Sequence, residues 1–391
     1  MTPLHDDRAL RMALSCVVDG GDPAAIELVS RAGPGGAWEA VKVGALGQPV
    51  AERAARLELA AVERAASGVG GRFVIPDDDE WPSGLNDLGR CAAVQRRGGV
   101  PIGLWLRGPG HLATMVERSV AIVGSRAATS YGNGMATDLA ADLADGGVTI
   151  VSGGAFGIDA AAHRGALAAG GPTVAVLANG VDVSYPRGNS KLFEWIAKDH
   201  LLVSELPPGT NPSRVRFLAR NRMIAALSQG TVIVEAALRS GARNTASWAL
   251  GCGRTLMAVP GPVHSTMSAA PHLMIREGQA SLVTSAADIL EVTSSIGENM
   301  VSYPHGEQRT TDYFDPTRLA VFEAVPARRP ASAGDIALLA GVALPACLRE
   351  LSALEESGMI AGDASGWRLA SRPRRSDEQG SVTRGAVHRW V

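Results

Sequence analysis

Short apolar runs alternate with helix-forming stretches through the middle of the chain, from Ser119 to about residue 290. The runs are rich in Val, Ile and Leu, as is typical of strands buried on both faces of a parallel sheet. This alternation predicts a doubly wound, Rossmann-like α/β domain with a mostly parallel sheet, whose ligand would lie beyond the carboxyl ends of the strands. The predicted strands are Val120–Val123, Val148–Val151, Thr173–Leu177, Leu201–Ser204, Thr231–Val234, Thr255–Val259 and Ser281–Val283, and the predicted helices are Tyr131–Ala144, Asp159–Ala169, Lys191–Asp199, Arg220–Ser228 and Thr245–Cys252.

Different patterns flank this region and predict further domains. The N-terminal part holds short helical repeats broken by turns, and a proline-punctuated stretch follows it. Beyond the α/β region, a polar stretch precedes three helical patterns and a two-strand hairpin, an order that suits a winged helix. The predicted divisions are a helical domain at 1–70, of the SAM or helix-hairpin-helix kind, an α/β domain at 71–295 with an extended lead-in to residue 117, a linker at 296–316, a winged helix at 317–370 and a basic tail at 371–391.

Composition agrees with a folded protein of two or three domains. Of the 391 residues, 46% are hydrophobic and 19% charged, so a large buried core is available. The formal net charge of −2 argues at first against a nucleic-acid partner. Net charge is an average over the whole chain, however, and binding depends on where the cations gather.

The cysteines and the N-terminus indicate a cytoplasmic location. The four cysteines lie far apart without a C-x-x-C pair, which predicts neither a zinc site nor a disulfide framework and fits a reducing cytosol. The N-terminal residues include acids where a signal peptide carries cations. The longest apolar runs fall short of the roughly 20 residues of a membrane helix, so no membrane partner is expected.

Glycine-rich turns follow the first two predicted strands of the sheet. The first strand ends in Gly124, Ser125 and Arg126, and the second leads into Gly153-Gly154. Glycine allows a sharp turn that brings backbone amides close to an anion at the start of a helix, and arginine binds phosphate with two parallel hydrogen bonds. An ordinary tight turn with a surface arginine explains the first motif equally well.

Two later motifs add candidate contacts. Tyr185 could stack on a base, Arg187 could reach a phosphate, and Asn189 follows in the same loop, although Tyr-Pro is also a common loop anchor. Asp159 and His163 lie four residues apart on one helical face. A helix-packing histidine is favoured there over a metal or acid–base pair.

The densest cluster of donors is Arg220, Asn221 and Arg222, placed at the start of a predicted helix. Helical spacing sets the two arginines about 200° apart, so both would face one groove only if the helix begins there. Otherwise one of them would pair internally with Glu205 or Glu235. The motif Ser240-Gly241 then opens a further loop-to-helix turn.

These motifs, taken in order, resemble the DprA (Smf) family of DNA-processing proteins. The resemblance covers about residues 73–290 and rests on Gly-Ser-Arg, Ser-Gly-Gly-Ala-x-Gly-Ile-Asp-x-x-Ala-His, Tyr-Pro-x-x-Asn, Arg-Asn-Arg, Glu-Ala-x-x-x-Ser-Gly and Val-Pro-Gly. It implies a single-stranded DNA-binding homodimer, without catalytic residues, cofactor or metal, that protects incoming DNA and passes it to the RecA recombinase in natural transformation. It also implies a C-terminal winged helix. The implied DNA contacts include Gly124, Arg126, Gly153, Gly154, Arg187 and Arg220, to which the motifs add Ser125, Asn189, Asn221, Arg222, Ser240 and Gly241.

The sequence departs from the family pattern at three places. Where the family often has lysine, this chain has Arg187, and Ala242-Arg243-Asn244-Thr245 replaces the usual Ser-Leu-Ile-Thr. Ala270-Pro271-His272 stands near the place where the family tends to have Gly-x-Asn or Gly-x-His. The last two of these loops are therefore expected to differ in shape.

The sequence lacks the motifs of other function classes. There is no Gly-Lys of an ATP-binding loop, no G-x-S-x-G and no H-E-x-x-H. A nucleotide phosphoribohydrolase of the LOG-like group would need Pro-Gly-Gly-x-Gly-Thr, and only Glu235 stands as a lone acid candidate. A duplex-DNA regulator would need a basic recognition helix, but 344–357 carries only Arg349 beside acidic residues.

Overall fold

A computed structural model describes residues 6–294, 299 and 310–370 of the chain. The chain divides into two compact units, residues 1–301 and residues 302–391. The predicted linker, apart from residues 299 and 310–316, and the predicted basic tail lie outside the described residues.

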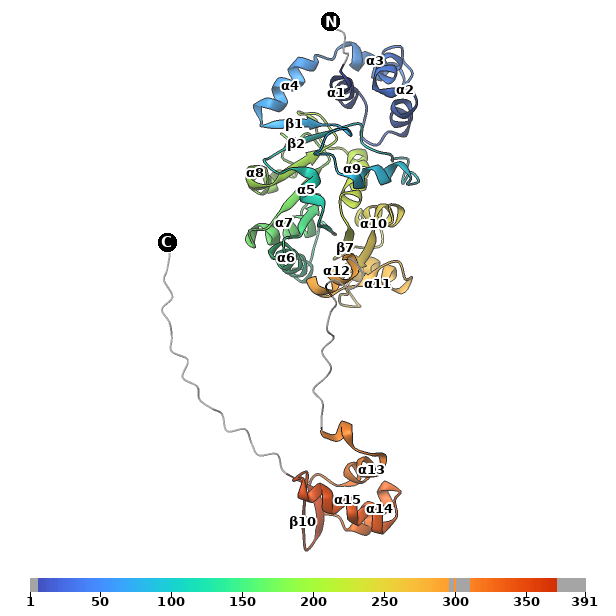
Figure 1. Ribbon diagram of the computed structural model, residues 1–391, viewed down its shortest axis with the longest axis vertical. Helices are drawn as coiled ribbons and strands as arrows, with labels where there is room; N and C mark the ends of the chain where they lie inside the picture. Colours follow the sequence, from blue (N-terminus) through green and yellow to red (C-terminus); the bar gives the residue numbers. More distant parts are fainter. Residues whose placement is uncertain (1–5, 295–298, 300–309, 371–391) are drawn as a thin grey trace, which may run out of the picture. The chain divides into compact units, whose positions relative to one another are not determined.

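A nine-stranded sheet forms the centre of the first unit (Figure 1). Its strand order is β1-β2-β6-β5-β4-β3-β7-β8-β9, and every pair from β6 to β9 is parallel, which confirms the mixed α/β fold with a mostly parallel sheet. The antiparallel strands β1 and β2 were not predicted. The strands are β1 (Gly71–Val74), β2 (Leu104–Arg107), β3 (Ser119–Val123), β4 (Thr149–Ser152), β5 (Thr173–Leu177), β6 (Leu201–Ser204), β7 (Gly230–Ile233), β8 (Thr255–Ala258) and β9 (Ser281–Leu282).

The strand order reverses between β3 and β7. Successive strands run outward from β3 on one side, and the chain then returns to place β7 on the other side. The two strands remain joined past their ends, since the Ser125 amide donates to the Glu235 carbonyl at 2.7 Å. Such a reversal opens a crevice at the carboxyl edge of a parallel sheet, where ligands of this architecture bind.

Helices cover both faces of the sheet, as the alternating pattern predicts. Inward side chains of β3 and β4 pack on one face against α9 and α10, and the alternate side chains pack on the other face against α6 and α7. Figure 1 shows these two helical layers on either side of the strands. The helices are α5 (Leu112–Val116), α6 (Ser130–Asp145), α7 (Ile158–Ala168), α8 (Ser190–Asp199), α9 (Arg214–Ala226), α10 (Ala242–Gly251), α11 (Ala269–Arg276) and α12 (Ala286–Thr293), with short 3-10 turns η1 (Ser83–Gly89), η2 (Arg187–Asn189) and η3 (Thr266–Ser268).

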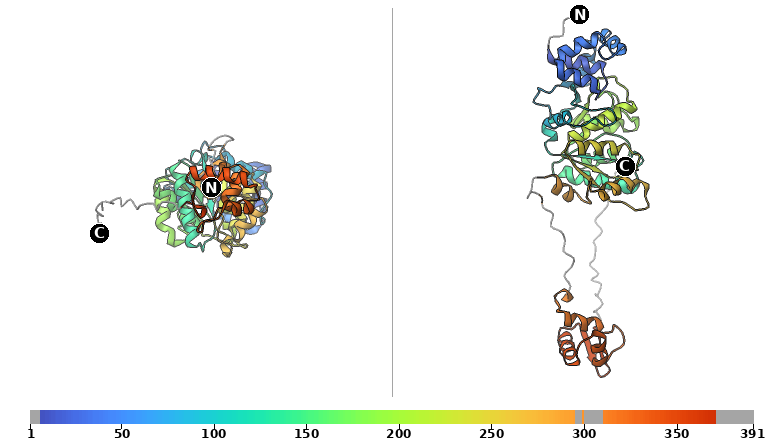
Figure 2. Two further views of the ribbon diagram at one scale, coloured as in Figure 1. Left: turned by 90° about the horizontal axis from the view of Figure 1, so that it is seen from below. Right: turned by 90° about the vertical axis from the view of Figure 1, so that its right-hand side faces the viewer.

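The N-terminal helices pack directly on the β1–β2 edge of the sheet. They have a small core of their own, but Met12 of α1 and Ala66 of α4 also join the cluster around Phe73 and Trp105, whose rings lie 4.7 Å apart. These helices therefore belong to the first unit and gather at one end of it (Figure 2). They are α1 (Asp7–Val17), α2 (Pro23–Lys42), α3 (Gln48–Ala55) and α4 (Leu59–Gly68).

The second unit is a small bundle of three helices with an antiparallel hairpin. Its core includes Val321, Ile336, Cys347 and Leu351, and a bridge from Ala331 adds a third segment beside the hairpin. In the part of the chain that the structure describes, no single helix is long and apolar enough to cross a membrane. The elements are a 3-10 turn η4 (Thr310–Tyr313), α13 (Pro316–Ala324), α14 (Ala333–Ala340), α15 (Leu344–Glu356), β10 (Ile360–Asp363) and β11 (Gly366–Leu369).

Candidate nucleic-acid interface

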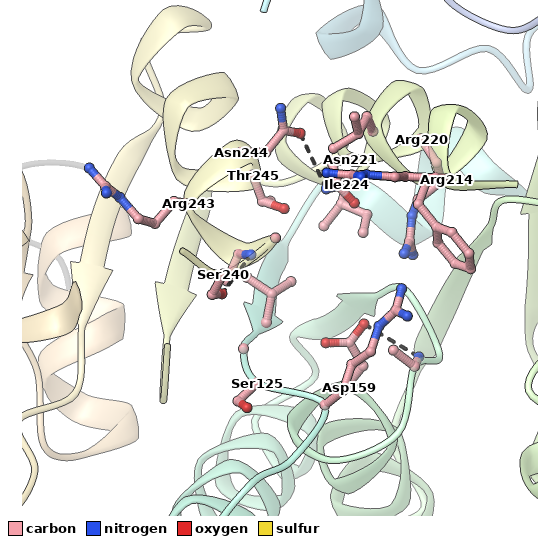
Figure 3. Close-up of a pocket in the computed structure, with 18 of the residues that line it drawn as sticks. Ser125, Asp159, Arg214, Arg220, Asn221, Ile224, Ser240, Arg243, Asn244 and Thr245 are labelled. Carbon is pink, nitrogen blue, oxygen red and sulfur yellow. Dashed lines mark hydrogen bonds between the residues drawn. The ribbon is translucent and has the colours of Figure 1, made fainter. Parts of the chain in front are cut away.

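A groove of about 1060 Å³ opens where the strand order reverses. One side comes from the loop after β3, and another from the loop after β7 together with the first turns of α10. Helix α9, the turn at Val94 and Gln95, and Asp159 and Tyr185 from the segments after β4 and β5 also line it. Figure 3 shows Ser125, Ser240 and Arg220 around the same space, with Arg243 extending outward from it. The groove thus lies at the crevice that the strand order predicts.

Arginine dominates the charge of this groove. Among the described residues that line it, Asp159 is the acidic one, and it is buried. A surface so biased toward guanidinium groups attracts a polyanion, even though the whole chain has a slightly negative formal charge. The lining arginines are Arg126, Arg214, Arg220, Arg239 and Arg243.

Two of these arginines lie near the same aromatic ring. The guanidinium carbon of Arg126 lies 4.6 Å from the centre of the Phe217 ring, and that of Arg220 lies 5.9 Å from it. Tyr185 packs beside Phe217 at 5.8 Å between ring centres and is 41% exposed. Arg126 and Arg220 therefore face one site, where an exposed aromatic ring could also contact a base.

Arg220 is buried beside an acid that it does not directly bind. Its Nη1 donates to the Val176 carbonyl at 2.7 Å, and burial lowers the pKa of Arg220 to about 10, against the opposing field of Asp159. Burial likewise raises the pKa of Asp159. The buried Nε of Arg220 meets no hydrogen-bond partner among the described residues.

The structure gives the glycine turns a steric role. The Ala155 amide donates to the Asp159 carboxylate at 3.4 Å, and the backbone at Gly124 and Gly153 lowers the pKa of the same carboxylate against the effect of burial. A Cβ on Gly124 would meet the Glu235 carbonyl at 2.7 Å, and a Cβ on Gly153 would collide with the Arg220 guanidinium. Gly153 therefore makes room for arginine, and the amide cradle stays a prediction.

We expect Gly153→Ala to weaken nucleic-acid binding through Arg220. The new methyl group would displace the guanidinium, and losing one phosphate contact flattens the log–log salt dependence on a single strand by about 0.7. Gly134→Ala is the matched control, because a Cβ there has open space. Titration of a dT oligomer at several salt concentrations measures the slope. Equal slopes for the two variants would contradict this role of Gly153.

Asn189 and Arg187 do not line the groove. The Asn189 side chain is buried and donates to the Gly154 carbonyl at 3.0 Å, so it ties the loop after β5 to the loop after β4. This contact replaces the predicted role of Asn189 as a DNA ligand. Arg187 is exposed on the neighbouring loop, outside the lining residues. It stays a predicted contact for a strand that extends past Tyr185.

Arg222 faces the opposite side of α9 from the groove. Helix α9 begins at Arg214, capped by the Ser213 side chain, so the 200° separation of the two arginines holds in full. The guanidinium of Arg222 has no exposed area and forms a two-point ion pair with Glu205, at 2.5 and 2.9 Å. The predicted DNA contact by Arg222 is therefore corrected, and the internal pairing with Glu205 is confirmed.

The remaining predicted residues line the groove, except that Gly153 and Gly154 lie outside the lining. Ser125 and Ser240 sit in the loops after β3 and β7, and Gly241 follows in the second loop. The Asn221 side chain donates to that of Asn244 at 3.2 Å and so joins α9 to α10.

The prediction missed Arg214, Arg239 and Arg243. Arg239 and Arg243 flank the Ser240-Gly241 turn, and Arg214 begins α9, but the strand order is what brings them to the same edge as Arg126. The glycine motif marked the turn without marking these arginines as contacts.

His163 is a packing residue and not part of the groove. It is fully buried, and its Nδ1 lies 2.7 Å from the Thr173 hydroxyl. Burial lowers the pKa of His163 to about 3, from an ordinary value near 6.5. Within the described ranges, no three His, Cys, Asp or Glu side chains come together as a metal site.

This burial predicts a pH dependence of stability. Above pH 6.5 the histidine is neutral in both states, and as the pH falls toward 3 only the unfolded chain takes up the proton, so stability is lost. His163→Asn removes this contribution. We expect the difference in unfolding free energy between the parent and His163→Asn to shrink from pH 7 to pH 5 in urea titrations. A constant difference would contradict the lowered pKa.

Comparison with known proteins identifies the family. The sequence model for "DNA recombination-mediator protein A" matches residues 72–294, more than half of the chain. The chain belongs to this family. It is 43% identical to a putative DNA processing protein DprA of Mycobacterium tuberculosis, over 93% of this chain and 94% of the relative.

Two further members of the DprA family support the assignment. Protein Smf of Escherichia coli is 36% identical, over 68% of this chain and 73% of its own. The X-ray structure of DprA from Streptococcus pneumoniae is 30% identical and aligns with a TM-score of 0.61, covering 74% of this chain and 98% of the other. The matched region contains the sheet and the arginine groove.

Proposed function

We propose that this DprA-family protein binds single-stranded DNA in the arginine groove. The observation that carries the proposal is the group of five arginines at the point where the strand order reverses, with a buried acid as their acidic neighbour. Arginine forms paired hydrogen bonds with phosphate, and a row of arginines suits an extended backbone better than one compact ligand.

The aromatic side chains favour a single strand over a duplex. Tyr185 and Phe217 lie within the lining, and Tyr185 is exposed. Stacking on an aromatic ring requires an unpaired base, whereas bases in a duplex are covered by their neighbours. Stacking depends little on base identity, so we expect weak sequence preference.

We infer that the protein acts by binding and not by catalysis. Glu235, the acid that a LOG-like phosphoribohydrolase would use, holds the start of α6. Its two oxygens accept from the Thr129 amide at 2.9 Å and the Thr129 hydroxyl at 2.6 Å. A carboxylate held in this way is poorly placed to serve a substrate. Ribose 5-phosphate released from AMP at a robust rate would restore the enzymatic alternative.

We further propose that a cytoplasmic homodimer protects incoming DNA and delivers it to the RecA recombinase during natural transformation. This step rests on the family resemblance and on the family's description as a recombination mediator. The solution mass, measured alone and with a dT oligomer, tests the dimer.

For the second unit we propose a winged helix that contacts protein and not duplex DNA. Between α14 and α15 the chain bends by 107°, within the range of helix-turn-helix pairs. Four leucines around this bend are exposed, Leu338, Leu339, Leu344 and Leu348, and Arg349 is the exposed cation of α15. A duplex-reading helix needs several cations at such positions.

Direct binding is the first test of the proposed function. Fluorescence anisotropy should show the full chain binding labelled dT oligomers more tightly than duplexes of equal length at the same salt concentration. Tighter duplex binding would overturn the single-strand assignment.

A further inference from the structure

Two cysteines far apart in sequence meet next to the groove. The Sγ atoms of Cys91 and Cys252 lie 3.0 Å apart, about 1 Å longer than a disulfide bond. Cys91 is partly exposed on the segment after η1, and Cys252 is buried at the end of α10. The two thiols join segments that are 161 residues apart in the chain.

Other contacts hold these segments together whatever the state of the thiols. Arg254, two residues after Cys252, donates to the Asp87 carboxylate at 2.7 Å and to the Gly84 carbonyl at 3.3 Å. Cys91 and Val94 also pack against the core that contains Trp248 and Cys252. A bond between the sulfurs would therefore need little movement of the backbone.

The segment that carries Cys91 forms one wall of the groove. Val94 and Arg97 close a two-residue turn with backbone hydrogen bonds of 3.0 and 3.1 Å. Its central residues, Gln95 and Arg96, have φ values of 51° and 62°, which are unfavourable for residues with a side chain. Val94 and Gln95 line the groove together with residues of α10, and Val94 packs against the cluster that contains Trp248 of that helix. A strained turn of this kind can relax unless something holds it.

We propose that Cys91 and Cys252 form a reversible intramolecular disulfide. The bond fixes the 94–97 turn against α10 and so reduces the mobility of this wall of the groove. The effect on binding rests on the proposed DNA-binding function, whereas the bond itself does not. Nothing in the spacing of the cysteines along the sequence indicates this pair.

The chemistry needs a small-molecule disulfide as the oxidant. The Cys91 thiolate attacks one sulfur of the oxidant and expels a thiolate, and Cys252 then attacks the mixed disulfide and expels the second thiolate. The protein loses two electrons and two protons, and the oxidant is reduced to two thiols. Burial raises the pKa of Cys252 to about 12, and Cys91 adds to the rise, so exchange begins at the more exposed Cys91.

The bond is tested without DNA. The full chain is incubated in glutathione buffers of increasing oxidised fraction, alkylated, and analysed by mass spectrometry. We expect a linked peptide pair containing Cys91 and Cys252, reversed by dithiothreitol, and a higher melting temperature of the oxidised protein. The Cys252→Ser variant should show neither the linked peptides nor the higher melting temperature, and the Cys16→Ser variant should show both. A stable glutathione adduct on Cys91, or a bond between two chains, would overturn the proposal.

The role in the groove is tested by dissociation of a labelled dT oligomer. We expect the oxidised parent to release the oligomer several-fold more slowly than the reduced parent, and Cys252→Ser to show no redox effect. Equal rates for the linked and reduced parent would overturn the role in the groove. Failure of the reduced parent to bind at all would instead count against the proposed function.

Discussion

Replacing Arg222 with alanine is expected to lower the free energy of unfolding by about 3–5 kcal/mol. The change would leave the Glu205 carboxylate, which is 8% exposed, without its cationic partner. It would also remove the bond from Arg222 Nε to the Gly99 carbonyl at 3.0 Å. Urea unfolding at neutral pH measures the loss.

Arg216→Ala is the matched control on the same helix. Arg216 pairs with Asp19 at 3.2 Å, but both side chains are partly exposed, so we expect a loss of about 1 kcal/mol or less. Replacing both partners of the buried pair, as Arg222→Met with Glu205→Leu, should restore most of the stability, because no unpaired charge remains. A loss below about 1 kcal/mol for Arg222→Ala would contradict this account of the ion pair.

The ion pair also explains how α9 serves two purposes. Glu205 accepts from the Gly21 amide at 3.3 Å, so the pair fastens the turn between α1 and α2 to the sheet. The other side of α9 presents Arg220 and Phe217 to the groove. The N-terminal helices therefore fix the position of the helix that carries part of the proposed binding site.

Sequence patterns were sufficient for the centre of the fold. Short apolar runs identified every parallel strand from β3 to β9. For β3 to β8 the reason is that strands buried on both faces have little choice of composition, whereas β9 is exposed. The antiparallel strands β1 and β2 were missed, since they lie in a stretch punctuated by prolines. The pairing of β2 with β6 is a long-range contact without a local signal.

Residues of the site could be predicted only where they belong to a recognisable sequence motif. Gly124, Gly153 and Arg126 were found because glycine turns follow apolar strands. Arg220 and Arg222 could not be separated until the start of α9 was known, although Ser213 offered a capping signal for that start. Arg239 reaches the groove only through the order of strands in the sheet.

The proposed interface predicts that the exposed groove arginines set the affinity for single strands. Arg126 lies on the loop after β3 and Arg243 in the first turn of α10, and both are exposed. Charge-assisted contacts contribute about 1.5 kcal/mol or more each, so the double change to alanine should weaken binding about a hundredfold. Neither guanidinium is part of the core, so the melting temperature should stay unchanged.

Arg118→Ala provides the control for total charge. This arginine is also exposed, but it precedes β3 and so lies at the opposite edge of the sheet from the groove. The Arg118→Ala variant should bind dT oligomers with the same affinity as the parent.

The most direct measurement is the salt dependence of binding to a dT oligomer by the parent, the Arg126→Ala/Arg243→Ala double variant and Arg118→Ala. We expect the double variant to have a log–log slope flatter by about 1.4, with the slope of Arg118→Ala equal to that of the parent. If all three proteins gave the same slope and affinity, the strand would bind elsewhere, and the arginine groove would not be the nucleic-acid site.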